Sequence, residues 1–146
     1  MQTAMHYMIG MRFVDTNVLI YAVCSAPEDV EKSGVAMELL KRPDLVLSVQ
    51  VLQEFYVQAT RITRMGALTH DEAVLFTTSL TRYRVQELSL SVLFQAFDYK
   101  KQFGLSYWDA AILAAARVSR CRTVYSEDFN PGQDYDGVRV INPFAS

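Results

Sequence analysis

The sequence predicts an α/β fold: a three-layer α/β/α sandwich with a central parallel sheet of about five strands. Short apolar runs of strand length alternate with longer segments of helical periodicity, which favours a parallel sheet with right-handed connections. A chain of 146 residues, 51% of them hydrophobic, is long and apolar enough for one domain with its own core. We therefore expect a single domain over residues 11–144, after an N-terminal extension, residues 1–10, to which we assign no role.

The first part of the chain is expected to form a strand, two helices and a second strand. Residues 11–14 form a short buried strand, and residues 18–24 form the helix that follows it. Pro27 suits the first position of a helix that runs to about Lys41, because proline there loses no helical hydrogen bond. Residues 45–47, Leu-Val-Leu, form the second strand.

The middle of the chain is expected to hold two helices and the third strand. Ser48 can cap the first of these helices. Its apolar stripe consists of Val51, Leu52, Phe55, Tyr56, Ala59 and Ile62. Residues 69–72, Thr-His-Asp-Glu, form a capping box for a second helix that ends near Arg82, and residues 85–88 form the strand after it.

Two further helices follow, and both have clear boundary signals. Ser89 caps a helix that Gly104 ends, and Ser106 caps the next one. The stretch 110–116 within that second helix is too apolar for a surface helix. We therefore expect it to lie against the sheet, where its small side chains allow close approach.

The remaining strands complete the predicted sheet. Residues 122–126 form the fourth strand and residues 138–141 the fifth. The segment between them, residues 130–137, is rich in turn-forming residues and is expected to be a loop.

The charge of the chain limits its partners only weakly. A net charge of −2 and a pI near 5.6 argue against a nucleic-acid partner. If four of the acids bind a metal ion, however, the remaining surface is net positive and basic side chains are free to contact phosphates. These are Arg61, Arg64, Arg82, Arg84, Lys100, Lys101, Arg117, Arg120 and Arg122.

Cysteine content and apolar runs indicate the compartment. Cys24 and Cys121 lie far apart in apolar contexts, which is typical of small buried hydrophobes in a reducing compartment. No apolar run approaches the ~18–20 residues of a membrane span. Residues 1–10 contain no Lys or Arg, unlike a secretory signal. We therefore expect a cytoplasmic protein with no membrane partner.

Three aspartates lie where the predicted elements meet. Asp15 follows the first strand, Asp128 follows the fourth, and Asp109 lies in the first turn of the apolar helix. In a parallel sheet these residues gather at its carboxyl edge, where open α/β sheets bind ligands. Two such charges repel by about 4 kcal/mol at ~4 Å and an effective dielectric near 20, so the group needs protons or cations. Oxygen ligands without Cys or His suit Mg²⁺ or Mn²⁺ better than zinc.

Each acid also has a structural interpretation. Asp15 can cap a helix or turn, and Asp128 lies in a loop, where acids are common. Asp109 is at the third position of a helix capped by Ser106, where a negative charge suits the helix dipole. The neighbours of Asp109 are apolar, however, so its desolvation is worthwhile only if it binds something. Glu54 lies outside the apolar stripe of its helix, so periodicity alone predicts a solvated side chain.

Four segments of the chain together form a family pattern: Phe13-Val-Asp-Thr-Asn-Val-Leu-Ile-Tyr21, Ser48-Val-Gln-Val-Leu-Gln-Glu54, Leu105-Ser-Tyr-Trp-Asp-Ala-Ala-Ile-Leu-Ala-Ala115 and Tyr125-Ser-Glu-Asp-Phe129. They resemble the motifs of the PIN-domain ribonucleases, and most closely those of the small VapC-type toxins of bacterial toxin–antitoxin modules. The resemblance covers residues 11–144. Its first and third motifs are specific in sequence and order, whereas the second is a lone Glu on a helix.

The resemblance implies acids that bind Mg²⁺ or Mn²⁺ and cut RNA. By motif position the acids are Asp15, Glu54, Asp109 and Asp128, and the supporting polar residues are Asn17 and Ser126. Glu127 is the alternative acid of the last motif, but an acid followed by Phe is the commoner fit and favours Asp128. The resemblance also implies a cognate antitoxin whose peptide covers the acidic groove, and a toxin homodimer.

We hypothesise that the four acids hold one or two metal ions and that a metal-activated water attacks an RNA phosphodiester in line. A Mg²⁺-dependent phosphatase is a weaker alternative, because Asn17 stands where such enzymes need a second Asp and no Lys follows the late strand. A PIN-like module that binds RNA or protein with little turnover is the other alternative. The presence of all four acids argues against this binding module. The sensitivity of RNA cleavage to EDTA discriminates between the module and the metal-dependent nuclease.

Overall fold

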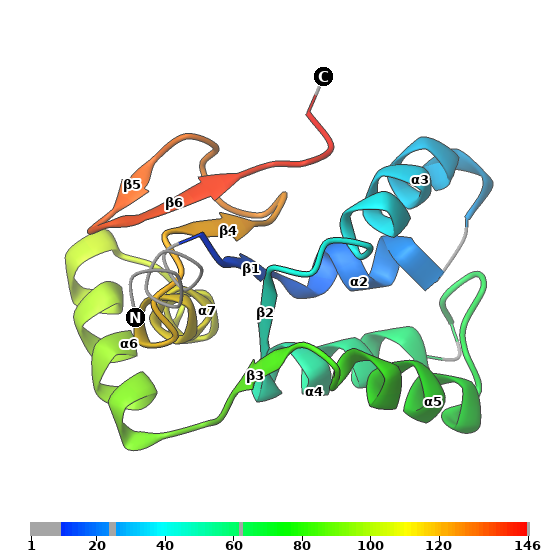
Figure 1. The fold of residues 1–146 in the computed structure, drawn as a ribbon, viewed down its shortest axis with the longest axis horizontal. Helices are drawn as coiled ribbons and strands as arrows, with labels where there is room; N and C mark the ends of the chain where they lie inside the picture. The colour runs from blue at the N-terminus through cyan, green and yellow to red at the C-terminus, as the bar shows by residue number, and fades with distance from the viewer. Residues whose placement is uncertain (1–9, 24–25, 62, 146) are drawn as a thin grey trace.

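A six-stranded sheet with the order β3-β2-β1-β4-β6-β5 organises the chain (Figure 1). The computed structural model describes residues 10–23, 26–61 and 63–145. The strands are β1 (Arg12–Val14), β2 (Leu45–Ser48), β3 (Arg84–Gln86), β4 (Thr123–Tyr125), β5 (Asp134–Tyr135) and β6 (Val138–Ile141). Every pairing is parallel except that of β5 with β6, so the predicted α/β fold with a mainly parallel sheet is confirmed.

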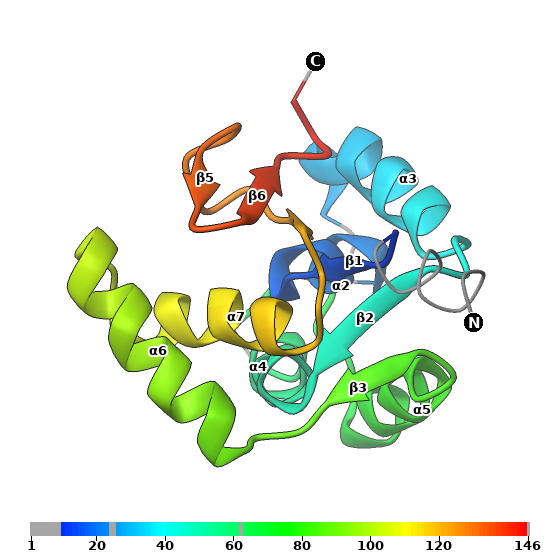
Figure 2. The same cartoon turned by 60° about the vertical axis from the view of Figure 1, so that its left-hand side comes forward.

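Helices cover both faces of this sheet. They are α2 (Thr16–Val23), the 3₁₀ turn η1 (Pro27–Asp29), α3 (Val30–Leu39), α4 (Val49–Ala59), α5 (His70–Leu80), α6 (Leu90–Phe103) and α7 (Tyr107–Val118). The connections from β1 to β2 and from β2 to β3 step one way along the sheet, whereas that from β3 to β4 steps back. Right-handed crossovers therefore place α2 to α5 opposite α6 and α7. Figure 2 shows α6 and α7 on one side of β1 and β2, with α3 and α5 on the other.

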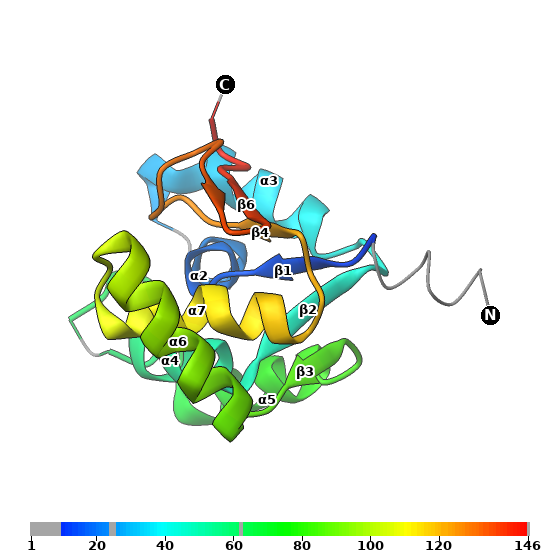
Figure 3. The same ribbon diagram turned by 90° about the vertical axis from the view of Figure 1, so that its left-hand side faces the viewer.

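The direction of the strand order reverses at β1, which lies between β2 and β4. The carboxyl ends of β1 and β4 therefore border a topological switch point, the usual ligand site of an open α/β sheet. The backbone N–H of Asp15 donates to the Tyr125 carbonyl at 3.0 Å, which ties the two strand ends together. Figure 3 shows β1 leading directly into α2 at this edge.

The core is centred on α7, which contacts β2, β4 and β6. Residues 110–116 of this helix are all buried, as predicted from their apolar character. The helix boundaries follow the predicted caps: Ser106 accepts from Asp109 N–H, and Gly104 ends α6 in the left-handed conformation at φ 67°. Because α7 lies directly on the sheet, its first turn is held close to the switch point.

The sheet contains one strand that the sequence did not predict. Residues 130–137 were expected to be a loop, yet β5 lies within them and pairs with β6 through a tight hairpin. Asp136 and Gly137 have φ values of 51° and 94°, the conformation for which Asp-Gly turns are suited. The dipeptide itself was the available signal, but the surrounding Pro, Gly and Asn favoured a loop.

Other differences from the predicted elements are small. The helix predicted from Pro27 to Lys41 is divided into η1 and α3, which ends at Leu39. Ile62, Cys24 and residues 1–9 of the predicted extension lie outside the described residues. In the part of the chain that the structure describes, no helix is long and apolar enough to cross a membrane.

Candidate functional site

Asp15 lies at the carboxyl end of β1 and is 5% exposed. Its Oδ1 accepts a hydrogen bond from the backbone N–H of Thr16, and its Oδ2 accepts one from the Ser126 hydroxyl, both at 2.7 Å. Each carboxylate oxygen therefore has one protein donor and keeps further acceptor capacity. The position follows from the local sequence, because β1 ends at Val14 and α2 begins at Thr16.

Ser126 and Asn17 join the loop after β4 to the start of α2. The buried hydroxyl oxygen of Ser126 accepts from Asn17 Nδ2 and from the backbone N–H of Asp128, both at 3.1 Å. Asn17 Nδ2 also donates to Asp128 Oδ2 at 3.1 Å. The structure thus holds Asp128 beside the end of β1, although Asn17 and Asp128 are 111 positions apart.

Glu54 reaches the same place from α4, where its side chain is half-buried. Thr16 Oγ1 donates to its Oε2 at 3.0 Å, and Gln50 Nε2 donates to its Oε1 at 2.8 Å. Periodicity indicated a solvated Glu54, and that expectation is wrong because Thr16 from α2 and Gln50 from the same helix hold both oxygens. Sequence reasoning missed the contributions of Thr16 and Gln50. The four-residue spacing from Gln50 to Glu54 was a usable signal, whereas no local pattern links Thr16 to Glu54.

Asp109 is exposed in the first turn of α7. Its backbone N–H donates to Ser106 Oγ at 3.1 Å, which fixes the start of the helix. Partial burial of its carboxylate is the largest cause that raises its pKa, followed by the negative charge of Asp128, and the charge of Glu54 adds to both. The Asp109 carboxylate is therefore close enough to interact electrostatically with Asp128 and Glu54.

The four acids, called the acid site below, share one electrostatic environment. Burial is the largest cause that raises the pKa of Asp15 to about 7, against the lowering effect of its hydrogen bonds from Ser126 and Thr16. The charges of Asp128 and Glu54 raise it further. A carboxylate whose pKa is raised by neighbouring negative charges is stabilised by a proton or by a cation. The structure thus brings together all four acids that the sequence singled out.

Glu127, the alternative acid of the last motif, contacts a different set of residues. The hydroxyl of Tyr21 donates to Glu127 Oε1 at 2.6 Å, and Lys32 Nζ forms an ion pair with Oε2 at 3.0 Å. Lys32 Nζ also donates to the Tyr21 hydroxyl at 3.2 Å. These three residues, called the Lys32 cluster below, compensate the charge of Glu127 within the chain.

The donors of the acid site suit a hard cation. All are oxygens, and the buried Oδ1 of Asn17 has no hydrogen-bond partner among the described residues. Over residues 10–23, 26–61 and 63–145, no three His, Cys, Asp or Glu side chains stand close enough to hold a metal ion by themselves. This arrangement is compatible with Mg²⁺, which commonly keeps several waters and takes only one or two carboxylates.

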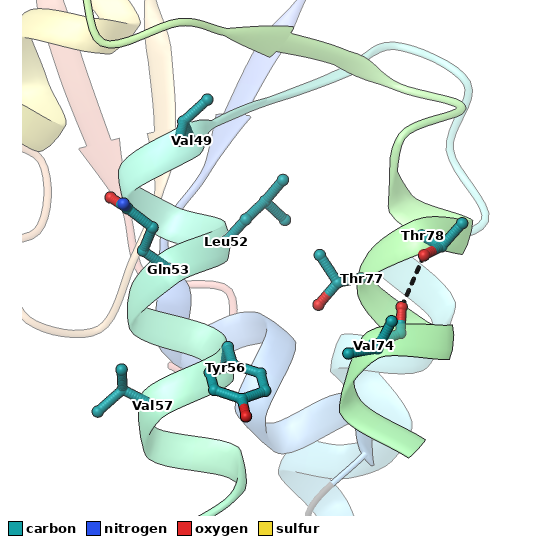
Figure 4. A pocket seen from close by; sticks show the side chains of 8 residues that line it. All are labelled: Val49, Leu52, Gln53, Tyr56, Val57, Val74, Thr77 and Thr78. Atoms are coloured by element: carbon teal, nitrogen blue, oxygen red, sulfur yellow. Dashed lines mark hydrogen bonds between the residues drawn. The ribbon is translucent and has the colours of Figure 1, made fainter. Parts of the chain in front are cut away.

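An apolar groove between α4 and α5 differs from this site in chemistry. Its volume is about 470 Å³. Figure 4 shows the side chains that line it: Val49, Leu52, Gln53, Tyr56, Val57, Val74, Thr77 and Thr78. No carboxylate, ammonium, guanidinium or imidazole group is among these lining residues, so the groove suits apolar contacts rather than hydrolysis.

The sequence also matches a known protein family. The PIN domain family matches residues 12–132, which is more than half of the chain. No curated protein matches the sequence.

Several solved structures resemble this one. A toxin–antitoxin complex from Klebsiella pneumoniae matches with a TM-score of 0.66 at 19% identity, over 90% of this chain and 97% of that one. VapC20 from Mycobacterium tuberculosis, described as a sarcin-ricin loop cleaving toxin, matches with a TM-score of 0.62 at 22% identity, over 82% and 91%. FitAcB from Neisseria gonorrhoeae matches with a TM-score of 0.63 at 20% identity, over 92% and 99%. At these identities the likeness establishes the fold.

Proposed function

The chain belongs to the PIN domain family, and on that premise we propose that residues 11–144 form a metal-dependent endoribonuclease that acts as the toxin of a toxin–antitoxin module. The observation that carries the proposal is the acid site at the switch point of the sheet. Hydrolysis of an anionic phosphodiester needs positive charge beside the phosphate, and gathered acids provide it by binding cations. The similar VapC20 is described as cleaving the sarcin-ricin loop, which supports RNA as the class of substrate.

The proposed cofactor is Mg²⁺ or Mn²⁺. Asp15, Asp109, Asp128 and Glu54 would hold it, directly or through water, and the unpartnered Oδ1 of Asn17 is a further oxygen at the same place. A divalent ion held by these residues would lower the pKa of a bound water and would neutralise negative charge on the phosphate and the leaving oxygen.

The surrounding residues keep the acids in position for that chemistry. Ser126 donates to Asp15, and Asn17 donates to Asp128. Gln50 and Thr16 each hold one oxygen of Glu54, the group that we propose to orient the attacking water. Hydrogen bonds of this kind fix the direction of a metal ligand's lone pairs. Their loss commonly lowers metal affinity or activity by about 10–100-fold.

The proposed partners are a cognate antitoxin and a second copy of the chain. The similar structure from Klebsiella pneumoniae is described as a toxin–antitoxin complex, which supports a protein inhibitor. A basic side chain of such an antitoxin would find uncompensated carboxylates in the acid site. A cytoplasmic location, expected from the sequence, is part of the same proposal.

The direct test is cleavage of RNA by the purified chain with Mg²⁺ or Mn²⁺, with and without EDTA. We expect cleavage that requires the added ion and that Asp15→Asn abolishes. Glu127→Gln is the matched control, because it removes one negative charge from the neighbouring Lys32 cluster and leaves the acid site intact. Equal cleavage by wild type and Asp15→Asn, or cleavage that survives EDTA, would overturn the proposal.

The second candidate is a PIN-like module that binds RNA or protein with little turnover. The observation that favours it is the lack, within the described residues, of three acids already close enough to hold a metal ion. This candidate predicts that RNA binds to the wild type without being cut at any concentration of Mg²⁺ or Mn²⁺. The cleavage experiment therefore separates the two candidates.

A further inference from the structure

Trp108 is a large aromatic side chain that remains 65% exposed beside the acid site. It is in the first turn of α7 and directly precedes Asp109, so its Cα lies about 3.8 Å from that of an acid proposed to hold the metal. Exposed tryptophan is uncommon because its indole is largely apolar, and a ring left in solvent beside a reaction site is available to a ligand.

The backbone of Trp108 is tied to the acids by one buried side chain. Gln50 is 6% exposed, and its Nε2 donates both to the Trp108 carbonyl at 3.1 Å and to Glu54 Oε1 at 2.8 Å. The indole also packs edge-on against Tyr107, with ring centroids 5.1 Å apart and an interplanar angle of 81°. These contacts hold the tryptophan in a set position relative to Glu54 and Asp109.

Trp108 lines a hollow together with Gln50, the side chain that donates to Glu54 of the acid site. This hollow has a volume of about 390 Å³, within the ~300–1,000 Å³ of typical small-ligand pockets. It lies between α4, α7 and the segment from β3 to α6, elements that Figure 2 shows side by side. Among its lining residues are Gln50, Gln53, Ser89 and Trp108, so polar groups able to pair with a base edge accompany the aromatic face.

We propose that Trp108 is a stacking platform for an unpaired nucleobase of the RNA substrate, next to the phosphate that is cut. The proposal rests on the function given above and deepens it, because it makes the substrate single-stranded or looped RNA with a base free to leave its stack. Aromatic side chains recognise unpaired RNA in this way, since every base offers a π-face. A protein partner is a weaker occupant, because Gln50 both lines the hollow and donates to Glu54, which links the hollow to the acid site.

The sequence contains a single tryptophan, so its fluorescence reports on this site alone. The probe is a short mixed-sequence single-stranded RNA, titrated into the Asp15→Asn chain so that it is not cut. We expect quenching of Trp108 that follows binding measured independently by anisotropy of a labelled RNA. The same sugar–phosphate backbone without bases should bind with little quenching. RNA binding that leaves the fluorescence unchanged, or no RNA binding, would overturn the proposal.

Steady-state cleavage by otherwise wild-type chains gives the second measurement. We expect Trp108→Leu to raise KM by about 5–100-fold with a smaller effect on kcat, and Trp108→Phe to restore KM to within about threefold. Phe94→Leu is the control, because Phe94 is similarly exposed, at 60%, but does not line the hollow.

The outcomes separate this proposal from the proposed function. If the wild type does not cut RNA, the proposed function fails. If it cuts RNA and Trp108→Leu leaves KM unchanged, only the stacking proposal fails. A change of molecular mass in solution on Trp108→Leu, with KM unchanged, would instead assign the ring to a protein interface.

Discussion

Asp128 and Glu127 are neighbours in the loop after β4, but their carboxylates lie in surroundings of opposite charge. Glu127 accepts a hydrogen bond from Tyr21 and forms an ion pair with Lys32. The hydrogen bond from Lys32 to Glu127 is the largest of the causes that raise the pKa of Lys32 to about 12. Asp128 receives only the neutral amide of Asn17 among the side-chain contacts described, and its charge raises the pKa of Asp15. The charge of Glu127 is compensated within the chain, whereas the acid site around Asp128 is left with an excess of negative charge.

The difference teaches what each carboxylate is available to do. A compensated carboxylate has little to gain from a cation, so the Lys32 cluster serves to tie the loop to α2 and α3. Its ion pair is partly exposed, with side chains 41% and 23% accessible, so its contribution to stability is small. A carboxylate without such compensation destabilises the fold until a cation or a proton binds it. Active sites commonly contain groups of this kind.

The largest expected effect separates these two neighbours directly. We expect Asp128→Asn to lower the rate of RNA cleavage by about 100-fold or more, because it removes a proposed metal ligand. Glu127→Gln should keep the rate within about threefold, since its partners lie outside the acid site. The measurement is initial rate at saturating Mn²⁺. Equal losses in the two variants would show that both acids serve the reaction.

The second prediction concerns pH and stability in the absence of metal. The folded chain raises the pKa of Asp15 from 3.8 to about 7, so between these values the folded state binds a proton that the unfolded state does not. The stability contributed by this proton is present at low pH and is lost as pH rises toward 7. The amide of Asp15→Asn does not titrate, so only the wild type loses this stability as the pH rises. Between about pH 5 and about pH 8, the free energy of unfolding of Asp15→Asn should therefore increase relative to that of the wild type by up to about 3 kcal/mol.

Urea unfolding at both pH values, with EDTA present, measures that difference. Glu127→Gln is the control and should show no comparable change with pH. A stability difference between Asp15→Asn and wild type that is independent of pH would contradict the buried, ionisable state of Asp15. Adding Mn²⁺ at the higher pH should then stabilise the wild type and leave Asp15→Asn unchanged.

A smaller effect is expected where a neutral residue positions an acid. Thr16→Val keeps the side-chain shape but removes the hydroxyl that donates to Glu54, so we expect about a tenfold loss of activity. Thr16→Ser keeps the hydroxyl and should retain most of the rate. Equal activity in the two variants would show that the Thr16 hydroxyl does not position Glu54.

The smallest effect is expected in the Lys32 cluster. Lys32→Met removes the ion pair with Glu127 and the contact of the ammonium with the Tyr21 ring, 4.9 Å from its centroid. We expect a fall in Tm of about 3 °C or less, diminishing at high salt, with an unchanged cleavage rate. A large loss of cleavage would show that this cluster supports the acid site after all.

The α/β class and most element boundaries followed from the sequence because their causes are local. The capping box of Thr69 and Glu72 and the left-handed Gly104 depend on residues within one helical turn. Asp15 and Asp109 were visible for the same reason, since each charge stands at the end of an apolar segment. The hairpin at residues 136–137 was missed because its Asp-Gly signal lies within a region where many turn residues compete.

Tertiary structure alone decided which acids belong together. The order of the strands sets β1 beside β4, so Asn17 meets Asp128 and Ser126 meets Asp15 across 111 positions. No local pattern could turn Asp128 toward that site and Glu127 toward Lys32, or bring Thr16 to Glu54. The sequence by itself determined which segments form strands and helices and where charges interrupt them. Burial, shared repulsion and the choice of partners were decided by long-range packing, because they depend on distances that only the folded chain defines.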